Sequence, residues 1–270
     1  MPAIIIRPTS ALTPQMAATV PKAAKHICVD IETGHASEEA IELAQEFAKA
    51  AANIKDPEKI KVALEEKRAK IREKSALLDA APIACLSIVT ENEQAIFYYQ
   101  GMPWPKKLKA ITDIKGFEGE IFFGKDEADM LVMVRTWLDL RAVPASIFIG
   151  FNIYGFDLPK LRQAYVRHRL TLPNVLKPEA ADAGVETYDV MQKFLRYFTA
   201  EKAGEFYIKL EEVEARLGLP SYKGRVSGAE VPGMVAAGKA REVLTYCYLD
   251  TLSTYAAFRA MTGQYAESKK

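Results

Sequence analysis

The sequence predicts an α/β fold in which helices cover a mixed sheet. Apolar runs of strand length alternate along the chain with segments whose apolar residues recur at helical spacing. One run, residues 145–152, is almost continuously apolar, which is typical of a strand in the middle of a sheet covered on both faces. The order of elements is three strands, a helix, a strand and then mostly helices.

Each expected element has a local signal. Val, Ile, Phe and Tyr are concentrated in the strands, whereas apolar residues three and four apart mark the helices. The expected strands are residues 26–31, 81–90, 94–100, 145–152 and, as a short strand or extended entry, 186–190. The expected helices of the body are residues 125–141, 157–170, 191–198, 209–220 and 239–261. We expect residues 1–25 to be a loosely structured lead-in to one domain that spans residues 26–270.

The sequence pattern of residues 37–80 predicts a helical hairpin inserted after the first strand. Ser37 is a favourable N-cap followed by acids, and Asp56 caps a second helix with Pro57 at its first position. Apolar residues at spacings of three, four and seven favour one apolar stripe on each helix. The stripe residues are Ile41, Phe47, Ala48 and Ala51 in the first helix and Ile60, Leu64, Ile71 and Leu78 in the second.

The composition excludes several classes of protein. Lys plus Arg number 36 and Asp plus Glu 35, so a polyanionic partner would have to be held by local patches. Three cysteines without a C-x-x-C pair argue against a disulfide framework and a zinc site, and they fit a cytoplasmic location. We expect no signal peptide and no membrane span, because no stretch approaches about 20 apolar residues.

Two acids, Asp30 and Glu32, end the first expected strand. Side chains alternate along a strand, so these two carboxylates point to the same side. Like charges so close raise each other's pKa unless a cation lies between them. A bound divalent cation would satisfy both carboxylates; the alternative is a strand that runs out into a solvated loop.

Another acid, Asp157, follows the strand at residues 145–152, with Asn152 and Phe156 just before it. Ligands of open α/β sheets collect where strands end, so a carboxylate here is well placed to bind one. Asp157 is also suited to cap the helix that begins at Pro159, and both roles are compatible.

The closing helix carries the last pair of candidates, Tyr246 and Asp250. Residues four apart lie on one face of a helix, so the phenol and the carboxylate are neighbours. An Asp on a packing face costs free energy unless it is paired or bound to a metal.

Together, D-x-E, N-x-x-x-F-D and Y-x-x-x-D resemble the motifs of the DEDDy 3′–5′ exonucleases of the DnaQ-like superfamily. The stretch GFNIYGFDLPKL is similar to the second exonuclease motif of family B DNA polymerases, and the resemblance covers residues 26 to about 261. It implies a ribonuclease H-like fold with a mixed five-stranded sheet flanked by helices. The hairpin is longer than the usual connection of that family, and the chain has no polymerase domain, so proofreading would occur in trans.

The resemblance implies that Asp30, Glu32, Asp157 and Asp250 hold two divalent cations, Mg²⁺ or Mn²⁺. Oxygen ligands suit such hard cations, and two metals stabilise the attacking and leaving oxygens of a phosphodiester. Tyr246 would orient the nucleophilic water, because a phenol with a pKa near 10 is a poor general base.

Substrate contacts are implied for Asn152 and Phe156, and for Ile31 and Thr33 of the first motif. Phe156 would stack or wedge against a terminal base. Thr245 stands where the related DEDDh enzymes have a histidine five residues before the last Asp, which excludes that mechanism.

Other polar residues receive more ordinary interpretations. Asp189 is expected to be a helix cap, and the histidines, His26, His35 and His168, are expected to be structural or exposed. Two basic groups are equally suited to contact phosphates or to form a solvated surface. They are Lys160, Arg162, Arg167 and Arg169 near the second motif, and Lys223 and Arg225 in a later loop.

The sequence thus predicts an exonuclease that hydrolyses phosphodiester bonds at DNA 3′ ends and releases nucleoside monophosphates. Single-stranded DNA or 3′ ends are the favoured partners. An exoribonuclease or oligonucleotide-degrading enzyme is the alternative, because discrimination depends on how the site treats the 2′-OH. A non-catalytic nucleic-acid-binding protein is a third reading, which the intact acids oppose. The hairpin is expected to border the substrate channel or to form a homo-oligomer interface.

Overall fold

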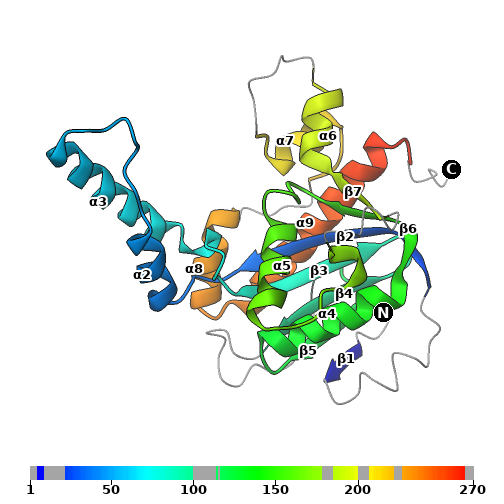
Figure 1. Cartoon of the computed structure of the whole chain (residues 1–270). Helices are drawn as coiled ribbons and strands as arrows, with labels where there is room; N and C mark the ends of the chain where they lie inside the picture. The colour runs from blue at the N-terminus through cyan, green and yellow to red at the C-terminus, as the bar shows by residue number, and fades with distance from the viewer. Residues whose placement is uncertain are drawn as a thin grey trace.

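The computed structural model describes residues 5–8, 22–99, 114, 116–177, 185–199, 207–221 and 227–264. These residues form a mixed seven-stranded sheet in the order β1-β5-β4-β3-β2-β6-β7 (Figure 1). The strands are β1 (Ile5–Pro8), β2 (Ala24–Thr33), β3 (Ile83–Thr90), β4 (Gln94–Tyr99), β5 (Glu120–Gly124), β6 (Ala142–Gly150) and β7 (Glu186–Asp189).

The sheet has seven strands rather than the expected five. The five predicted strands lie side by side as β4-β3-β2-β6-β7, and the two unpredicted strands, β5 and β1, extend the sheet beyond β4. Both are short and pair in parallel, so their stability comes from a neighbouring strand rather than from a local pattern. Part of the expected lead-in is therefore ordered, because β1 and the start of β2 fall within it; residues 1–4 and 9–21 lie outside the described residues.

Strand β2 occupies an inner position that sets up the site. It pairs antiparallel with β3, with Asp30 opposite Ser87 and Glu32 opposite Cys85. On its other side β2 pairs in parallel with β6, and the last pair in register there is Cys28 with Ile149. Beyond that pair, β3 is the one strand among the described residues that pairs with β2, so the strand end that bears the two acids is open toward β6.

Helices cover both faces of the sheet (Figure 1). α9 packs on β2, β3 and β6, whereas α4 packs on β4 and β5 and α5 on β2 and β3. The α-helices are α2 (Glu38–Glu46), α3 (Pro57–Glu73), α4 (Glu127–Arg141), α5 (Asp157–Arg167), α6 (Val190–Tyr197), α7 (Leu210–Arg216), α8 (Val231–Ala236) and α9 (Ala240–Met261). In the described part of the chain, no helix is long and apolar enough to cross a membrane.

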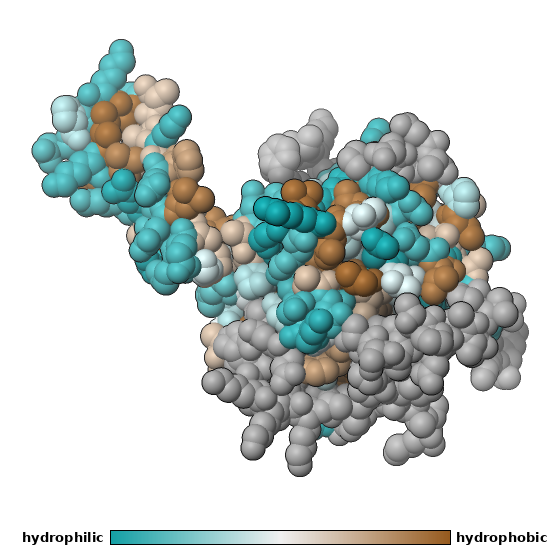
Figure 2. Space-filling view, turned by 60° about the horizontal axis from the view of Figure 1, so that its bottom comes forward, coloured by the Kyte–Doolittle hydropathy of each residue, from teal (hydrophilic) through white to brown (hydrophobic). Residues whose placement is uncertain are grey.

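The expected hairpin forms an arm, residues 37–74, that projects from the body (Figure 1). Ser37 caps α2 by accepting from the Ala40 N–H, and Asp56 caps α3 by accepting from two N–H groups, as predicted. Every residue of α3 is described, and none of their side chains is buried. Figure 2 shows hydrophobic residues among hydrophilic ones on the surface of the arm, and Phe47 is 73% exposed. The apolar stripes are thus only partly covered by each other.

The base of the arm is attached firmly to the body. The Thr33 hydroxyl donates to the Ala76 carbonyl at 3.1 Å, and the Gly34 N–H donates to the Pro82 carbonyl at 3.0 Å. Lys160 of α5 is buried and donates to the carbonyls of Ala76 and Leu78. The arm therefore leaves the body directly beside the open end of β2.

Candidate metal centre

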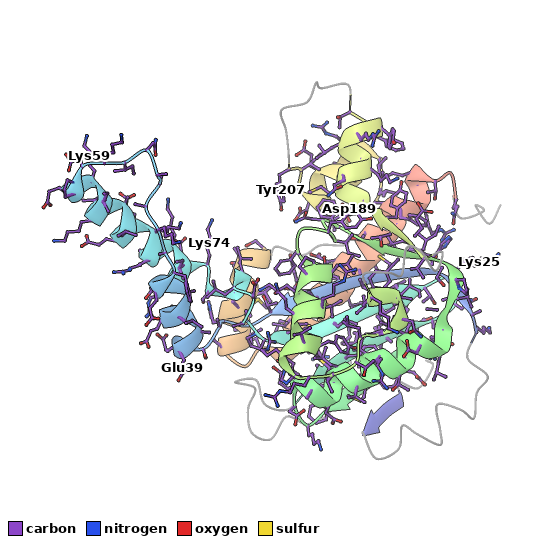
Figure 3. The ribbon with its side chains drawn as sticks, in the orientation of Figure 1. Lys25, Glu39, Lys59, Lys74, Asp189 and Tyr207 are labelled. Carbon is purple, nitrogen blue, oxygen red and sulfur yellow. The ribbon has the colours of Figure 1, made fainter. Side chains whose placement is uncertain are left out.

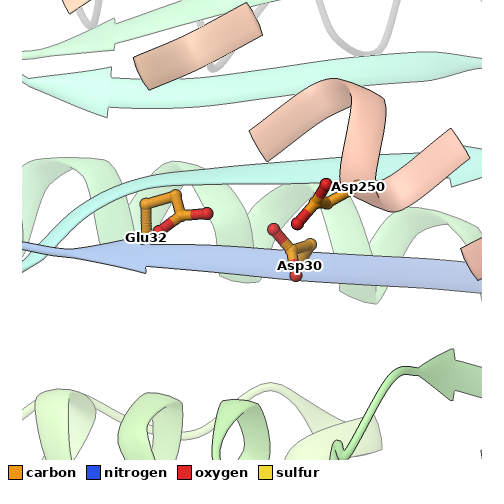
Figure 4. Close-up of side chains that lie close together, drawn as sticks. All are labelled: Asp30, Glu32 and Asp250. Carbon is orange, nitrogen blue, oxygen red and sulfur yellow. The ribbon is translucent and has the colours of Figure 1, made fainter. Parts of the chain in front are cut away.

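Three carboxylates converge between β2 and α9 (Figure 4). Asp30 and Glu32 point from β2 toward the face that α9 covers, and Asp250 of α9 lies across from them. One carboxylate oxygen from each lies within 4.8 Å of the others. The two-residue spacing on the strand places the first pair on one side, and the packing of α9 brings in the third.

The electrostatics of this cluster favour a cation. Burial raises the pKa of Glu32 well above its ordinary value, and the nearby charge of Asp30 raises it further. Three carboxylates this close together repel one another, and a divalent cation bound among them would reduce that repulsion. A donor set made only of oxygen suits Mg²⁺ or Mn²⁺ rather than a thiophilic metal. These residues therefore fit a hard divalent cation.

Asp157 stands beside this cluster, at the start of α5. Among the described residues it lies outside the group of three whose oxygens converge. Its Oδ1 accepts from the Ile31 N–H at 3.2 Å, in the gap that β6 leaves beside β2. Burial raises the pKa of Asp157 to about 8, and the charges of Asp189 and Asp250 contribute to the rise. Asp157 is thus electrostatically coupled to the cluster.

Tyr246 precedes Asp250 by one turn of α9 and is buried. Its hydroxyl is hydrogen-bonded to the Asp250 carboxylate. Burial raises the pKa of the phenol, and the charges of Asp250, Glu32 and Asp30 raise it further. The phenol therefore stays protonated at physiological pH and acts as a hydrogen-bond donor.

The loop between β6 and α5 has a tightly defined shape. Asn152 adopts a left-handed conformation with φ of 55°, and its carbonyl accepts from the N–H groups of both Gly155 and Phe156 at 3.0 Å. A Cβ at Gly155 would lie 2.5 Å from the Asn152 Oδ1, so a larger residue at this position would force the Asn152 side chain to move. Phe156 is half-buried and immediately precedes Asp157. The loop thus places the expected substrate-contacting residues next to the acid.

Asp189 holds this loop in place. It caps α6 by accepting from the Gln192 N–H at 3.1 Å, which confirms the predicted cap. It also accepts from the main-chain N–H groups of Asn152 at 3.2 Å and Tyr154 at 3.4 Å. This second role was not predicted from the sequence. Asn152 and Tyr154 lie 37 and 35 positions before Asp189, and nothing in the sequence indicates that they contact it.

Ile31 and Thr33 differ from the other expected substrate residues because both side chains are buried. The Thr33 hydroxyl is engaged with the base of the arm, and the Ile31 N–H with Asp157. Their side chains therefore face the protein interior.

The remaining polar candidates are mostly structural. Each histidine has a hydrogen-bond partner, as expected for structural residues: Tyr255 for His26, Ser75 for His35 and Glu127 for His168. Three of the four basic residues near the second motif donate within the protein. They are Lys160 to the base of the arm, Arg162 to the Leu176 carbonyl and Arg167 to Glu127. Lys223 and Arg225 lie outside the described residues.

Comparison with known families identifies the family of the chain. A family model described as a predicted 3′–5′ exonuclease related to the exonuclease domain of PolB matches residues 110–268, more than half of the chain. The matched segment contains Asp157, Tyr246 and Asp250, whereas Asp30 and Glu32 precede it. No curated protein matches the chain. The chain belongs to this family of predicted 3′–5′ exonucleases related to the exonuclease domain of PolB.

Proposed function

We propose that this protein is a metal-dependent 3′–5′ exonuclease that hydrolyses phosphodiester bonds at DNA 3′ ends and releases nucleoside monophosphates. The observation that carries the proposal is the convergence of Asp30, Glu32 and Asp250 within one cation's reach. Separate elements contribute these acids, so the arrangement is not a by-product of one local sequence.

In the proposed mechanism, Asp30, Glu32, Asp157 and Asp250 hold two divalent cations, Mg²⁺ or Mn²⁺, as in a DEDDy enzyme. Bound there, the cations would stabilise negative charge on the attacking and leaving oxygens and lower the pKa of water. The carboxylates fix the positions of these charges before the substrate arrives, so little reorganisation is needed during the reaction.

Tyr246 positions the nucleophilic water in this mechanism. A phenol, with an ordinary pKa near 10, is a poor general base near neutral pH, whereas its protonated hydroxyl is a donor beside Asp250. Asn152 and Phe156 contact the terminal nucleotides, with the Phe156 ring against a base. The main chain of Ile31 and Thr33 supplies any further contact, because both side chains are buried.

The setting we propose is the cytoplasm. Cys28, Cys85 and Cys247 are buried free thiols, a state that a reducing compartment maintains. The Cys247 thiol donates to the Asp30 carbonyl at 3.4 Å, so a free thiol contacts the main chain of a proposed metal ligand.

A labelled-substrate panel tests the proposal. It contains 3′-labelled and 5′-labelled single-stranded DNA, duplex DNA and RNA, each incubated with Mg²⁺, Mn²⁺ or EDTA. We expect stepwise shortening of 5′-labelled single-stranded DNA. The 3′-labelled strand should release a labelled mononucleotide, and both activities should be lost in EDTA. Faster degradation of RNA would favour the exoribonuclease alternative. Internal cuts, or shortening from the 5′ end, would contradict the proposal.

A further inference from the structure

A group of aromatic and basic side chains on α6 and the preceding strand β7 lies outside the metal centre. We call Tyr188, Lys193, Arg196 and Tyr197 the α6 ladder. The Lys193 ammonium lies 5.4 Å from the centroid of the Tyr188 ring and 6.0 Å from that of Tyr197, and the Arg196 guanidinium lies 5.2 Å from the Tyr197 centroid. Two cations therefore alternate with two rings along one short helix and the strand before it.

The outer part of the α6 ladder is not needed to pack the helix. The core-facing side of α6 is made by Val190, Met191 and Phe194, which are buried. Tyr197 is 60% exposed, and the adjacent Phe198 is 47% exposed while its ring stacks on that of Phe194. Exposed rings flanked by cations are the features with which proteins bind single-stranded nucleic acids, because bases stack on rings and phosphates pair with cations.

The α6 ladder is joined by hydrogen bonds to the loop between β6 and α5. Asp189, between Tyr188 and α6, accepts from the N–H groups of Asn152 and Tyr154. Tyr154 is itself half-exposed, and its hydroxyl donates to the Thr187 carbonyl, next to Tyr188. Figure 3 shows Asp189, the last residue of β7, at the base of α6. The surface thus continues from the loop that precedes Asp157 onto α6.

We propose that the α6 ladder binds the unpaired strand that leads to the metal centre, upstream of the terminal nucleotides. Bases stack on Tyr197, and phosphates contact Lys193 and Arg196. The eight residues of α6 span about 12 Å, which is enough for a few nucleotides. This inference rests on the proposed function, and it makes an unpaired 3′ tail, of DNA or RNA, the substrate class.

Binding of fluorescein-labelled dT12 and rU12, measured by anisotropy in EDTA, tests the α6 ladder without cleavage. Tyr197→Leu removes the ring, and we expect about 5- to 50-fold weaker binding with an unchanged salt dependence. Tyr197→Phe keeps the ring and should retain most of the affinity. The double variant Lys193→Ala/Arg196→Ala should reduce the slope of log Kd against log salt by about 1.4, because each lost phosphate contact contributes about 0.7.

A charge-matched control is Lys125→Ala/Arg135→Ala. Lys125 lies just before α4 and Arg135 within it, and α4 packs on β4 and β5, away from β7. This control should bind dT12 like the wild type. In the wild type, dT12 should bind more tightly than dT3, and the α6 variants should reduce that ratio. If they bind both strands as the wild type does while the wild type degrades DNA, the inference is wrong and the proposed function stands. If the wild type degrades no nucleic acid with any metal, the proposed function fails separately.

Discussion

The metal centre depends on a few residues whose individual properties are unusual. Glu32 and Asp157 are carboxylates whose pKa values are raised by burial and by neighbouring negative charge. Tyr246 is a buried phenol whose pKa is raised by burial and by three carboxylates. At neutral pH the two buried carboxylates destabilise the metal-free protein, and a cation would reverse this effect by favouring their charged form.

Tyr246→Phe should slow cleavage by roughly 10- to 1000-fold, the range for a positioning hydrogen bond. The ring stays in place and only the hydroxyl beside Asp250 is lost. Single-turnover rates on a 5′-labelled strand measure the effect. Calorimetric titration with Mn²⁺ provides the control: affinity should match the wild type, and clearly weaker binding would show that the phenol supports the metal site rather than the water.

Stability should depend on pH in a way that metal reverses. The pKa of Asp157 is raised from 3.8 to about 8 in the folded state, so the folded chain binds more protons than the unfolded chain between these values. The contribution of Asp157 to the free energy of unfolding without metal therefore falls as pH rises from about 4 to about 8. Metal binding requires deprotonated ligands, so the rise in Tm caused by Mg²⁺ or Mn²⁺ should be larger at pH 8 than at pH 6.

Thermal melts of the wild type and of Asp157→Asn, in EDTA and in Mn²⁺, measure this coupling. The asparagine can still accept from the Ile31 N–H, so the fold is preserved while the titrating group is removed. The metal-free Tm of the variant should fall less with pH than that of the wild type. A metal-induced shift that is equal at both pH values would contradict the electrostatic description of the site.

At the scale of elements, two hydrogen-bonded connections join the elements around the site. Asp189 fastens the loop before α5 to the start of α6, and Lys160 fastens α5 to the base of the arm. A third connection lies at the other end of α5. There the buried Glu127 of α4 accepts from the Ile83 N–H of β3 and pairs with Arg167 and His168.

Glu127→Ala should lower the free energy of unfolding by about 2–4 kcal/mol, because it leaves a buried N–H and a partly buried guanidinium without their partner. Denaturant unfolding followed by circular dichroism measures the change. Glu212→Ala, which removes an exposed ion pair with Arg216, is the matched control and should cost less than about 0.5 kcal/mol. Equal losses in the two variants would show that Glu127 does not join these elements.

The family match gives no information on the role of the arm, because the arm precedes the matched residues 110–268. Replacing residues 38–73 by a short Gly-Ser linker keeps the contacts of Thr33 and Lys160 with residues 76–78. We expect cleavage of a short single strand to persist, because the metal centre lies in the body. Substrate-length or strand preference, or the mass measured by light scattering, should change. If both remain as in the full-length protein, the arm neither guides 3′ ends nor joins subunits.

At the scale of the whole molecule, much of the site could be predicted from local spacing. Alternation along a strand pairs Asp30 with Glu32, and a helical turn pairs Tyr246 with Asp250. That these pairs meet depends on how α9 crosses β2, which only the family resemblance suggested. The partners of Asp189 could not be predicted, because they are main-chain groups with no sequence signal. Strands β1 and β5 were missed because they are short and rely on parallel neighbours.

The net charge of the whole molecule bears on how it binds a nucleic acid. Net charge is +1, so the molecule as a whole gives little attraction for a polyanion. Affinity must therefore come from local features, such as the cations of the α6 ladder and the bound metals of the proposed centre. We therefore predict that catalysis depends strongly on metal, and that it depends on the acids that hold the metals in the proposed centre.

The most direct test compares the wild type with Asp250→Asn on a 5′-labelled single strand at saturating Mn²⁺. The substitution keeps the shape of the side chain and removes its charge from the cluster of three carboxylates. We predict stepwise 3′ shortening by the wild type and a rate lower by about 100-fold or more for the variant, with unchanged circular dichroism. A folded variant that retains more than about a tenth of the wild-type rate would contradict the assignment of Asp250, and with it the metal centre.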